Sequence, residues 1–560
     1  MAAPVAVLKY APLLALIGGF AATAQEAPIA PPPAPAQAPA QAPAPAQAQS
    51  AAAQVAAPLV PEKNPCPARA EPVAIGSVQW NGWGRDLSNT RYQPEPAIRA
   101  LDVPKLALKW AYGYQAGTEF GQPTLVDGRL FVAGSAGRVY SLDAKTGCTY
   151  WTFDAPAGIR TAISIGELGQ AKRAAIPRKL KRTLAHLEVI KAPSAAFFGD
   201  DTGTVYALDA QKGTVLWKTQ VDSNPSARII GAPTLFKERL YVAVGSNEEK
   251  KSADPNYPCC TFRGSVAALD MAGGRLQWKT YTVLEEPQPT HKNSAGVQEF
   301  APAGAAVSSP PTIDAKRGVL YVGTGRSTAA LELSTTDSIA AYDLNDGKLR
   351  WVKQLRAVGA VPASSAFTSP PVFRTLSSGN DIILAAQTSG VVYGLDPDHG
   401  GEVLWQNRLG AEADAGGIAW GTAADYRSLF VAVAGSLAHP ANGNGGLWAL
   451  DPKTGIARWH TPAPTPACSA GDAPCSHAQS QAVTVMPGGV FSGSMDGHLR
   501  AYSTINGKIL WDFDTAKTHQ TLNAVRASGG PLDHGGATIV NGSVYINSGN
   551  TLLAFSVDGK

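Results

Sequence analysis

A block of two predicted strands occurs seven times along this chain. Each copy has an alternating strand that ends in Leu-Asp or a similar pair, a turn that contains glycine, and a second strand that ends in tryptophan. The copies occupy residues 137–151, 203–217, 264–278, 337–351, 390–405, 446–459 and 497–511. Two strands and a tight turn that return every roughly 40 to 70 residues are typical of a β-propeller.

The two ends of the chain complete this repeat. An eighth tryptophan, Trp110, lies in residues 108–114, and residues 550–560 supply the first half of a block without its tryptophan. We expect the two end strands to share one sheet, which closes the ring and protects sheet edges from pairing with other chains. The sequence therefore predicts an all-β fold, an eight-bladed β-propeller closed by its N- and C-terminal strands.

The eight tryptophans are interpreted as packing residues. The alternation Val-Tyr-x-Leu buries one face of a strand, and Asp and Gly suit the turn that follows it. An indole ring is large enough to fill the space between neighbouring sheets. We therefore expect the tryptophans to join one blade to the next.

The first 61 residues are not expected to belong to the propeller. Lys9, the apolar run after it and the small residues that end at Ala24 are typical of a secretory signal. Residues 1–24 are thus predicted to be a signal peptide, and the protein to be periplasmic or secreted. A retained membrane anchor is the alternative, but the run is too short to span a bilayer stably. Residues 25–61, almost wholly Ala, Pro and Gln, predict a semi-extended linker before the propeller at 62–560.

Charge limits the range of partners. The net charge is +4 and charged residues make up 16% of the chain, so no strong field indicates nucleic acid or acidic membranes as partners. We expect no nucleic-acid partner and no integral membrane span. Residues 170–193 hold seven Lys and Arg residues, which indicates either a docking patch for an acidic redox partner or a solvated insertion.

Six cysteines in an exported chain allow three disulfides. Cys468 and Cys475 flank a short loop and could pair locally. Cys66 and Cys148 could then tie the N-terminal segment to the first blade. Connectivity beyond these pairs is not determined by the sequence.

Cys259 and Cys260 are adjacent, in the loop predicted to join the second and third strands of one blade. Adjacent cysteines can bridge only through a strained eight-membered ring, and strain of this kind is found mainly at functional sites. The alternative is a loop with two unpaired or separately paired cysteines. We interpret the pair as part of a site on the face of the propeller that carries the central funnel.

Three motifs carry a resemblance to a known family. Residues 254–270 (DPNYPCCTFRGSVAALD), 80–94 (WNGWGRDLSNTRYQP) and 493–515 (GSMDGHLRAYSTINGKILWDFDT) resemble the polyvinyl alcohol dehydrogenases. These are pyrroloquinoline quinone (PQQ) dehydrogenases with eight-bladed propellers of the quinoprotein type, and the resemblance runs from about Trp80 to the C-terminus. It implies an exported enzyme that oxidises a secondary alcohol, with PQQ and calcium in the funnel and a cytochrome c as electron acceptor.

The resemblance also implies which residues form the site. A hard cation needs carboxylate oxygens, and the three carboxylates of PQQ need Arg, backbone NH and hydroxyl donors. It assigns calcium to Glu248 or Glu249. The implied cofactor contacts are Glu119, Arg160, Thr161, Gly245, Ser246, Asn247, Cys259, Cys260 and Trp420. Trp420 is equally well interpreted as a packing residue, and His519 and His534 are further funnel candidates that are more often structural.

Several positions differ from the family pattern. Arg326 stands where relatives commonly have an Asn or Asp that binds the metal. Thr388 stands where a Lys or Arg is usual. Residues 363–371 lack the usual general-base aspartate, a group often worth about 10²- to 10⁴-fold in rate. Either other carboxylates serve as the base, or the chain binds the cofactor poorly. The candidates are Glu286, Asp337 and Asp414.

Electrons from the alcohol are expected to leave through a separate protein. Covalent haem attachment needs Cys-x-x-Cys-His, a motif that this chain lacks, so a separate cytochrome c is expected. The substrate is predicted to be a polymer or a small molecule with secondary alcohol groups. The alternative is a non-catalytic propeller that serves as a binding or envelope-assembly scaffold.

Overall fold

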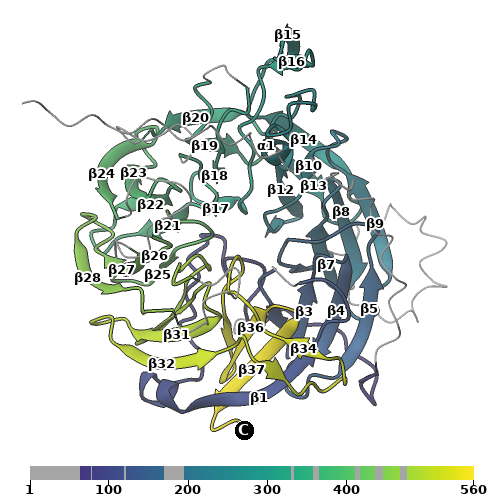
Figure 1. Ribbon diagram of the computed structural model, residues 1–560, viewed down its shortest axis with the longest axis vertical. Coiled ribbons are helices and arrows are strands. Elements are labelled where there is room, and N and C mark those ends of the chain that lie inside the picture. Colours follow the sequence, from purple (N-terminus) through teal and green to yellow (C-terminus); the bar gives the residue numbers. More distant parts are fainter. Residues whose placement is uncertain are drawn as a thin grey trace, which may run out of the picture. The chain divides into compact units, whose positions relative to one another are not determined.

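The computed structural model describes residues 63–76, 79–118, 121–168, 194–329, 333–356, 365–409, 417–435, 445–466 and 476–560. These residues form eight sheets of four or more strands arranged in a ring (Figure 1). The expected signal peptide, linker and basic insertion, and the Cys468–Cys475 loop, lie outside the described residues. No described helix is long and apolar enough to cross a membrane.

The first four blades use consecutive strands. Blade 1 contains β2 (Thr124–Val126), β3 (Arg129–Ala133), β4 (Arg138–Asp143) and β5 (Thr149–Asp154). Blade 2 contains β6 (Ser164–Glu167), β7 (Ser194–Gly199), β8 (Thr204–Asp209) and β9 (Val215–Gln220). Blade 3 contains β11 (Thr234–Phe236), β12 (Arg239–Ser246), β13 (Ser265–Asp270) and β14 (Leu276–Tyr281), with β10 (Ala227–Arg228) also paired to β12. Blade 4 contains β17 (Thr312–Asp314), β18 (Val319–Gly323), β19 (Ser338–Asp343) and β20 (Leu349–Gln354).

Three further blades follow the same order. Blade 5 contains β21 (Val372–Thr375), β22 (Asp381–Ala386), β23 (Val391–Asp396) and β24 (Glu402–Arg408). Blade 6 contains β25 (Ala423–Ala424), β26 (Leu429–Val433), β27 (Gly446–Leu450) and β28 (Ala457–Pro462). Blade 7 contains β29 (Thr484–Met486), β30 (Gly489–Gly493), β31 (His498–Ser503) and β32 (Ile509–Asp514).

The eighth blade joins the two ends of the chain. It contains β35 (Thr538–Val540), β36 (Ser543–Ser548), β37 (Thr551–Val557) and β1 (Leu106–Gly113), which follows the short helix η1 (Ala100–Lys105). β1 pairs with β37 antiparallel along its whole length. The predicted closure of the ring by the terminal strands is confirmed, and no blade edge is left open between the two ends.

Tryptophans bind each blade to the next, as the repeat predicts. Trp217 lies opposite Ala207, and the other seven pairs likewise set Ala, Ser or Gly opposite tryptophan, which leaves room for the ring. The indole NH of Trp217 donates to the Met271 carbonyl of blade 3 at 2.9 Å. Its ring covers Gly274, where an added Cβ would lie 2.4 Å away. Equivalent bonds to the next blade come from Trp151, Trp278, Trp405, Trp459 and Trp511.

The segment from Trp80 to Gln93 connects blades across the ring. Its backbone bonds to the innermost strands of blades 1, 4, 5, 6 and 7. Its side chains also bond to blades 2 and 8. The Asn81 amide bonds to the backbone of Ile165 in blade 2, and the Gln93 amide donates to the Ile539 carbonyl in blade 8. The motif therefore has a clear structural role, because one short segment links seven of the eight sheets.

Arg91 in this segment is completely buried. Its guanidinium donates to the Val483 and Trp83 carbonyls and to Gln122 and Thr484, at 2.6 to 3.0 Å. The guanidinium also lies over the ring of Trp83. Burial lowers the pKa of Arg91 to about 9, so the group remains charged at neutral pH without a carboxylate beside it.

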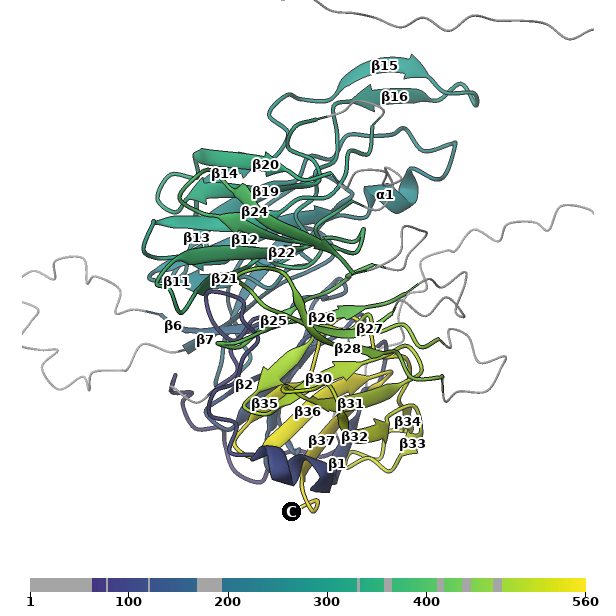
Figure 2. The same ribbon diagram turned by 90° about the vertical axis from the view of Figure 1, so that its left-hand side faces the viewer.

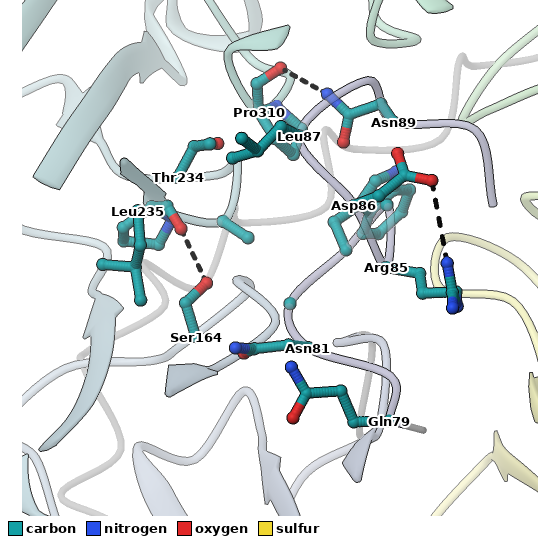
Figure 3. A pocket seen from close by; sticks show the side chains of 15 residues that line it. Gln79, Asn81, Arg85, Asp86, Leu87, Asn89, Ser164, Thr234, Leu235 and Pro310 are labelled. Carbon is teal, nitrogen blue, oxygen red and sulfur yellow. Dashed lines mark hydrogen bonds and ion pairs between the residues drawn. The ribbon is translucent and has the colours of Figure 1, made fainter. Parts of the chain in front are cut away.

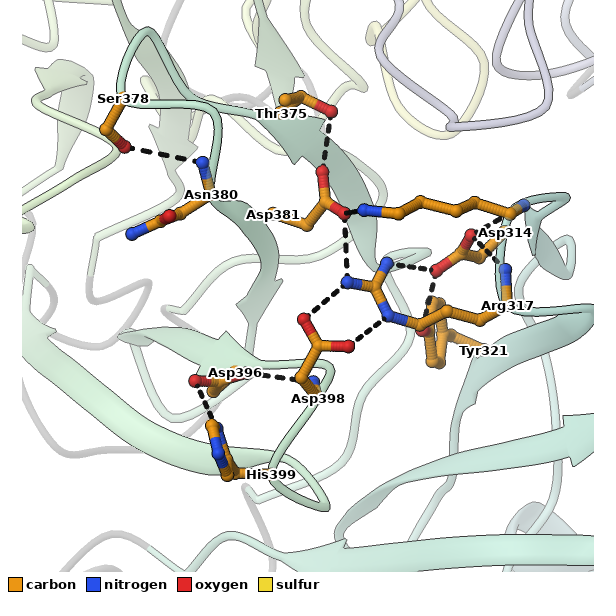
Figure 4. Close-up of polar contacts among 11 residues, drawn as sticks. Asp314, Arg317, Tyr321, Thr375, Ser378, Asn380, Asp381, Asp396, Asp398 and His399 are labelled. Carbon is orange, nitrogen blue, oxygen red and sulfur yellow. Dashed lines mark hydrogen bonds and ion pairs between the residues drawn. The ribbon is translucent and has the colours of Figure 1, made fainter.

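A disulfide and a group of ion pairs stabilise the ring further. Cys66 and Cys148 form the predicted disulfide between the N-terminal segment and blade 1. On the turns of blades 4 and 5, Arg317 contacts Asp314, Asp381 and Asp398 (Figure 4). Because these turns belong to neighbouring blades, the guanidinium ties one blade to the other.

Candidate functional site

One side of the ring carries the loops that join second to third strands and each blade to the next. We call this side the funnel face. It bears α1 (Glu248–Lys251) and two hairpins, β15 (Gln288–Lys292) with β16 (Gln298–Ala301) and β33 (Thr518–His519) with β34 (Ala527–Ser528) (Figure 2). Of the described residues that the resemblance implies, Gly245 and Ser246 end β12, Glu248 and Glu249 lie in α1, and the others lie in loops of this face.

Trp420 and His534 form the floor of the funnel. Their rings stack with centroids 3.9 Å apart, and the imidazole Nδ1 lies 3.1 Å from a carboxylate oxygen of Asp533. Burial opposes the charge of Asp533, but the hydrogen bond with His534 leaves the pKa of Asp533 below its usual value. The stack lines a small cavity of about 20 Å³ together with Trp83, Arg160, Ser308 and Thr368. Six blade entrances thus meet around one aromatic surface.

Unpartnered buried polar atoms occur at several blade entrances. Among the described residues, the hydroxyls of Ser309 and Ser369 and the amide of Gln481 are buried and have no hydrogen-bond partner. These residues occupy the entrances of blades 4, 5 and 7. Of these three residues, Ser309 lines the small cavity beside Trp420. Unpartnered buried polar groups are rare, and water or a polar ligand can complete their bonding.

Positive charge lines the wall above the floor. Asp201, in the turn between β7 and β8, accepts from Arg160 at 3.1 Å and lies 3.9 Å from Arg228. Asn247, with its amide turned to satisfy both neighbours, accepts from Arg228 at 2.7 Å. Burial and the charge of Arg228 lower the pKa of Lys251. Two arginines therefore share Asp201 in this wall, and Lys251 lies within electrostatic range of Arg228 and Glu248.

Thr161 and Ser246 have local roles in the structure. The Thr161 hydroxyl accepts from the backbone NH of Gly199, and the Ser246 hydroxyl accepts from the NH of Glu248. Thr161 is almost fully buried. Both hydroxyls therefore support loops of the funnel face, whether or not they also contact a ligand.

Glu248 is buried and its carboxylate is already bonded. It accepts from the Tyr257 hydroxyl at 3.0 Å, and from the backbone NH groups of Thr261 and Phe262 at 2.8 and 2.9 Å. These NH groups directly follow Cys260. Glu248 thereby fixes the loop that carries the cysteine pair.

Glu249 pairs with Arg326 of the neighbouring blade, with 2.7 Å between Oε1 and Nη2. Asp337 lies within electrostatic range of both groups and of Arg356, and burial raises the pKa of Asp337 to about 6. Asp337 occupies the first position of its block, which is glycine in the other six copies, and its φ is +52°. A non-glycine residue in this conformation carries strain, which proteins keep mainly where it serves a site.

Cys259 and Cys260 form a disulfide. They border a cavity of about 910 Å³ between their loop and the β15–β16 hairpin, together with Glu285, Glu286, His291, Glu299, Phe300 and Thr328. The small cavity at Trp420 has none of these residues in its lining. The structure therefore joins the expected cofactor contacts into two neighbouring regions of the funnel face rather than one.

Comparisons with known proteins identify the family. Residues 80–359 match the family "Glucose/ethanol/alcohol dehydrogenase, beta-propeller domain", and residues 388–560 match "Outer membrane protein assembly factor BamB". The chain is 39% identical to a polyvinylalcohol dehydrogenase of Pseudomonas sp. over 528 residues, 88% of this chain and 80% of that protein. It is 38% identical to the enzyme of the same name from Sphingopyxis sp. (strain 113P3), over 88% and 79% of the two chains. The chain belongs to the polyvinyl alcohol dehydrogenase family.

Solved structures agree with this assignment at the level of the fold. A quinohemoprotein alcohol dehydrogenase from Comamonas testosteroni superposes with a TM-score of 0.61 at 18% identity, over 86% of this chain and 81% of that one. The prediction of an eight-bladed propeller of the quinoprotein type is confirmed. The protein is accordingly a member of an enzyme family, the PQQ-dependent alcohol dehydrogenases.

The funnel face fits PQQ better than it fits calcium. Arg160, Arg228 and Arg326 supply donors for carboxylates. The Ser309 hydroxyl, in the cavity beside Trp420, has no hydrogen-bond partner among the described residues. Calcium needs six to eight oxygen ligands. Within the described residues, no group of three or more His, Cys, Asp or Glu is placed to hold a metal ion, and both predicted ligand carboxylates already have partners.

The three predicted bases differ in their surroundings. The side chain of Glu286 is 78% exposed and pairs with Arg263, whereas Asp337 is buried. Asp414 and the predicted cofactor contact Glu119 lie outside the described residues. Residues 365–371 contain no aspartate, and Thr388 donates to the Ala366 carbonyl in this region. Asp337 is thus the predicted base whose environment best suits proton transfer near neutral pH.

Sequence reasoning missed Asp201 and Arg228. Both lie outside the motifs that carry the family resemblance, and a single charged residue in a blade turn is common. The doublet Asp200-Asp201, in a turn of the funnel face, was the available signal.

A separate pocket of about 140 Å³ lies where Gln79–Asn89 meets β6 and β11 (Figure 3). Its walls are the blade-linking segment, so we interpret it as a packing gap.

Proposed function

We propose that this protein is an exported PQQ-dependent dehydrogenase that oxidises secondary alcohol groups of polyvinyl alcohol or related polyols. We further propose that electrons leave to a separate cytochrome c. The observation that carries the proposal is the identity of 39% to a polyvinylalcohol dehydrogenase over 88% of the chain. The charged wall and aromatic floor of the funnel face support it.

The residues of the funnel face have distinct roles in this proposal. Arg160 and Arg228 hold carboxylates of the cofactor, and Asp201 fixes the direction of both guanidinium groups. Trp420, stacked on His534, offers a flat surface for an aromatic ring system. Bound PQQ supplies a quinone that accepts two electrons from the alcohol.

Asp337 is the proposed acceptor of the alcohol proton. Burial raises its pKa to about 6. At pH 7 the carboxylate is therefore mostly ionised, and it is basic enough to accept a proton. One of its carboxylate oxygens, Oδ1, is buried without a partner among the described residues. Asp337→Asn should lower kcat at least 100-fold, within the range known for general bases, and leave PQQ binding unchanged.

Cofactor titration tests the proposal. Saturable quenching of tryptophan fluorescence by PQQ, followed by dye reduction with polyvinyl alcohol, is the expected result. Arg160→Met should weaken PQQ binding at least tenfold, because a charge-assisted hydrogen bond contributes about 1.5–3 kcal/mol. Arg458→Met is the matched control, since Arg458 pairs with Asp451 in a turn of blade 6. Absence of PQQ binding would instead favour the scaffold alternative.

A further inference from the structure

Arg326 occupies the position that a metal ion would need beside Glu249. The guanidinium Nη2 lies 2.7 Å from the Glu249 carboxylate. Glu249 is the predicted ligand whose carboxylate is otherwise exposed and able to turn toward a cation. A divalent cation would have to displace this guanidinium or lie beside it, and like charges at close range repel strongly in a partly buried site.

Glu248 cannot replace Glu249 as the ligand without losing its own contacts. Three donors approach its carboxylate, two of them backbone NH groups. These NH dipoles point their positive ends at the oxygens and neutralise the charge that a metal ion would require. Freeing this buried carboxylate would leave both NH groups unpaired, at a cost of about 1–3 kcal/mol each.

Arg326 retains donors for a ligand. A guanidinium has five NH donors, and the ion pair of Arg326 with Glu249 uses Nη2. Its Nε–H is buried and has no hydrogen-bond partner among the described residues. Asp337 and Glu249 balance the charge of Arg326. The arrangement presents a fixed positive charge with a free donor on the funnel face.

We propose that Arg326, held in place by Glu249, is the fixed cation of this cofactor site and that the site works without calcium. The proposal rests on the proposed PQQ dependence. The guanidinium donates to an oxygen of the bound cofactor and stabilises negative charge there, a role that a metal ion would otherwise fill. Arg326 is held by an ion pair between neighbouring blades, so it reaches this position without a bound metal.

The test compares PQQ binding to the full-length protein in two buffers. One buffer contains EGTA after exhaustive removal of divalent cations, and the other contains millimolar calcium. We expect the same PQQ dissociation constant within twofold, and no calcium binding by calorimetry to the PQQ-loaded protein. PQQ binding only with calcium would overturn this inference and leave the proposed function standing. Absence of PQQ binding in both buffers would overturn both.

Two variants of Arg326 sharpen the result. Arg326→Asn should weaken PQQ binding in EGTA at least tenfold, and calcium should restore part of the loss because an amide oxygen becomes available beside a freed Glu249. Arg326→Lys keeps the charge and should lose less affinity. Arg350→Asn is the matched control, because Arg350 pairs with Asp343 in the same blade. Equal PQQ affinity for Arg326→Asn and the wild type in EGTA, with unchanged circular dichroism, would refute the role of Arg326.

Discussion

Replacement of Arg91 by Met should strongly destabilise the propeller. The substitution keeps a long apolar side chain but removes four hydrogen bonds from a charged donor that is completely buried. Each such bond contributes about 1.5–3 kcal/mol. Removal of a buried charge returns several kcal/mol of desolvation free energy. The net loss in the free energy of unfolding is therefore expected to be about 3–5 kcal/mol.

The assay is urea denaturation followed by tryptophan fluorescence, with the midpoint read for the wild type and the variant. Arg99→Met is the matched control, because Arg99 is largely exposed and pairs with Asp102 on the surface, where ion pairs contribute about 0–1 kcal/mol. Arg91→Lys should be intermediate, since one ammonium cannot reach all four acceptors. Equal midpoints for Arg91→Met and Arg99→Met would refute the claim that this segment holds the ring together.

Three further perturbations test other parts of the fold. Gly274→Ala should destabilise by more than about 1 kcal/mol, because its φ is +68° and the new methyl would meet Trp217. Gly273→Ala should be nearly neutral in thermal melts, because its new methyl would lie 3.6 Å from Asp270, an ordinary contact distance. Arg317→Met should cost about 3 kcal/mol at pH 7. Burial opposes the charge of Asp381, but Thr375, Lys316 and Arg317 together keep the pKa of Asp381 below its usual value. This difference is therefore present above about pH 4 and should shrink as the pH falls further, as urea midpoints across pH will show. Cys148→Ser removes the disulfide to the N-terminal segment and should cost about 2–5 kcal/mol, visible as faster proteolysis near its partner.

Most of the fold could be predicted from the sequence because the repeat carries it. The glycine turn and the tryptophan recur at fixed positions, and the packing of Trp217 on Gly274 shows why both are needed. The incomplete block at the C-terminus predicted the pairing of β37 with β1. The pairing of Cys66 with Cys148 was also predicted, since few other partners were available.

The site was harder to predict because it is made of single residues from many blades. The sequence assigned Glu248 to a metal ion, but only the structure shows the backbone NH groups that bond its carboxylate. Likewise the pairing of Glu249 with Arg326 depends on two loops 77 residues apart. Long-range pairings between loops have no local signal, unlike the strands and turns of the repeat.

A single-turnover experiment decides whether this protein is a PQQ-dependent alcohol dehydrogenase. The PQQ-loaded protein is mixed anaerobically with a secondary alcohol, without dye or cytochrome, and the cofactor spectrum and the ketone product are followed together. PQQ-dependent alcohol oxidation should reduce the bound cofactor and form one ketone per PQQ. A bound cofactor that stays oxidised, with no ketone formed from either small alcohols or polyvinyl alcohol, would contradict it.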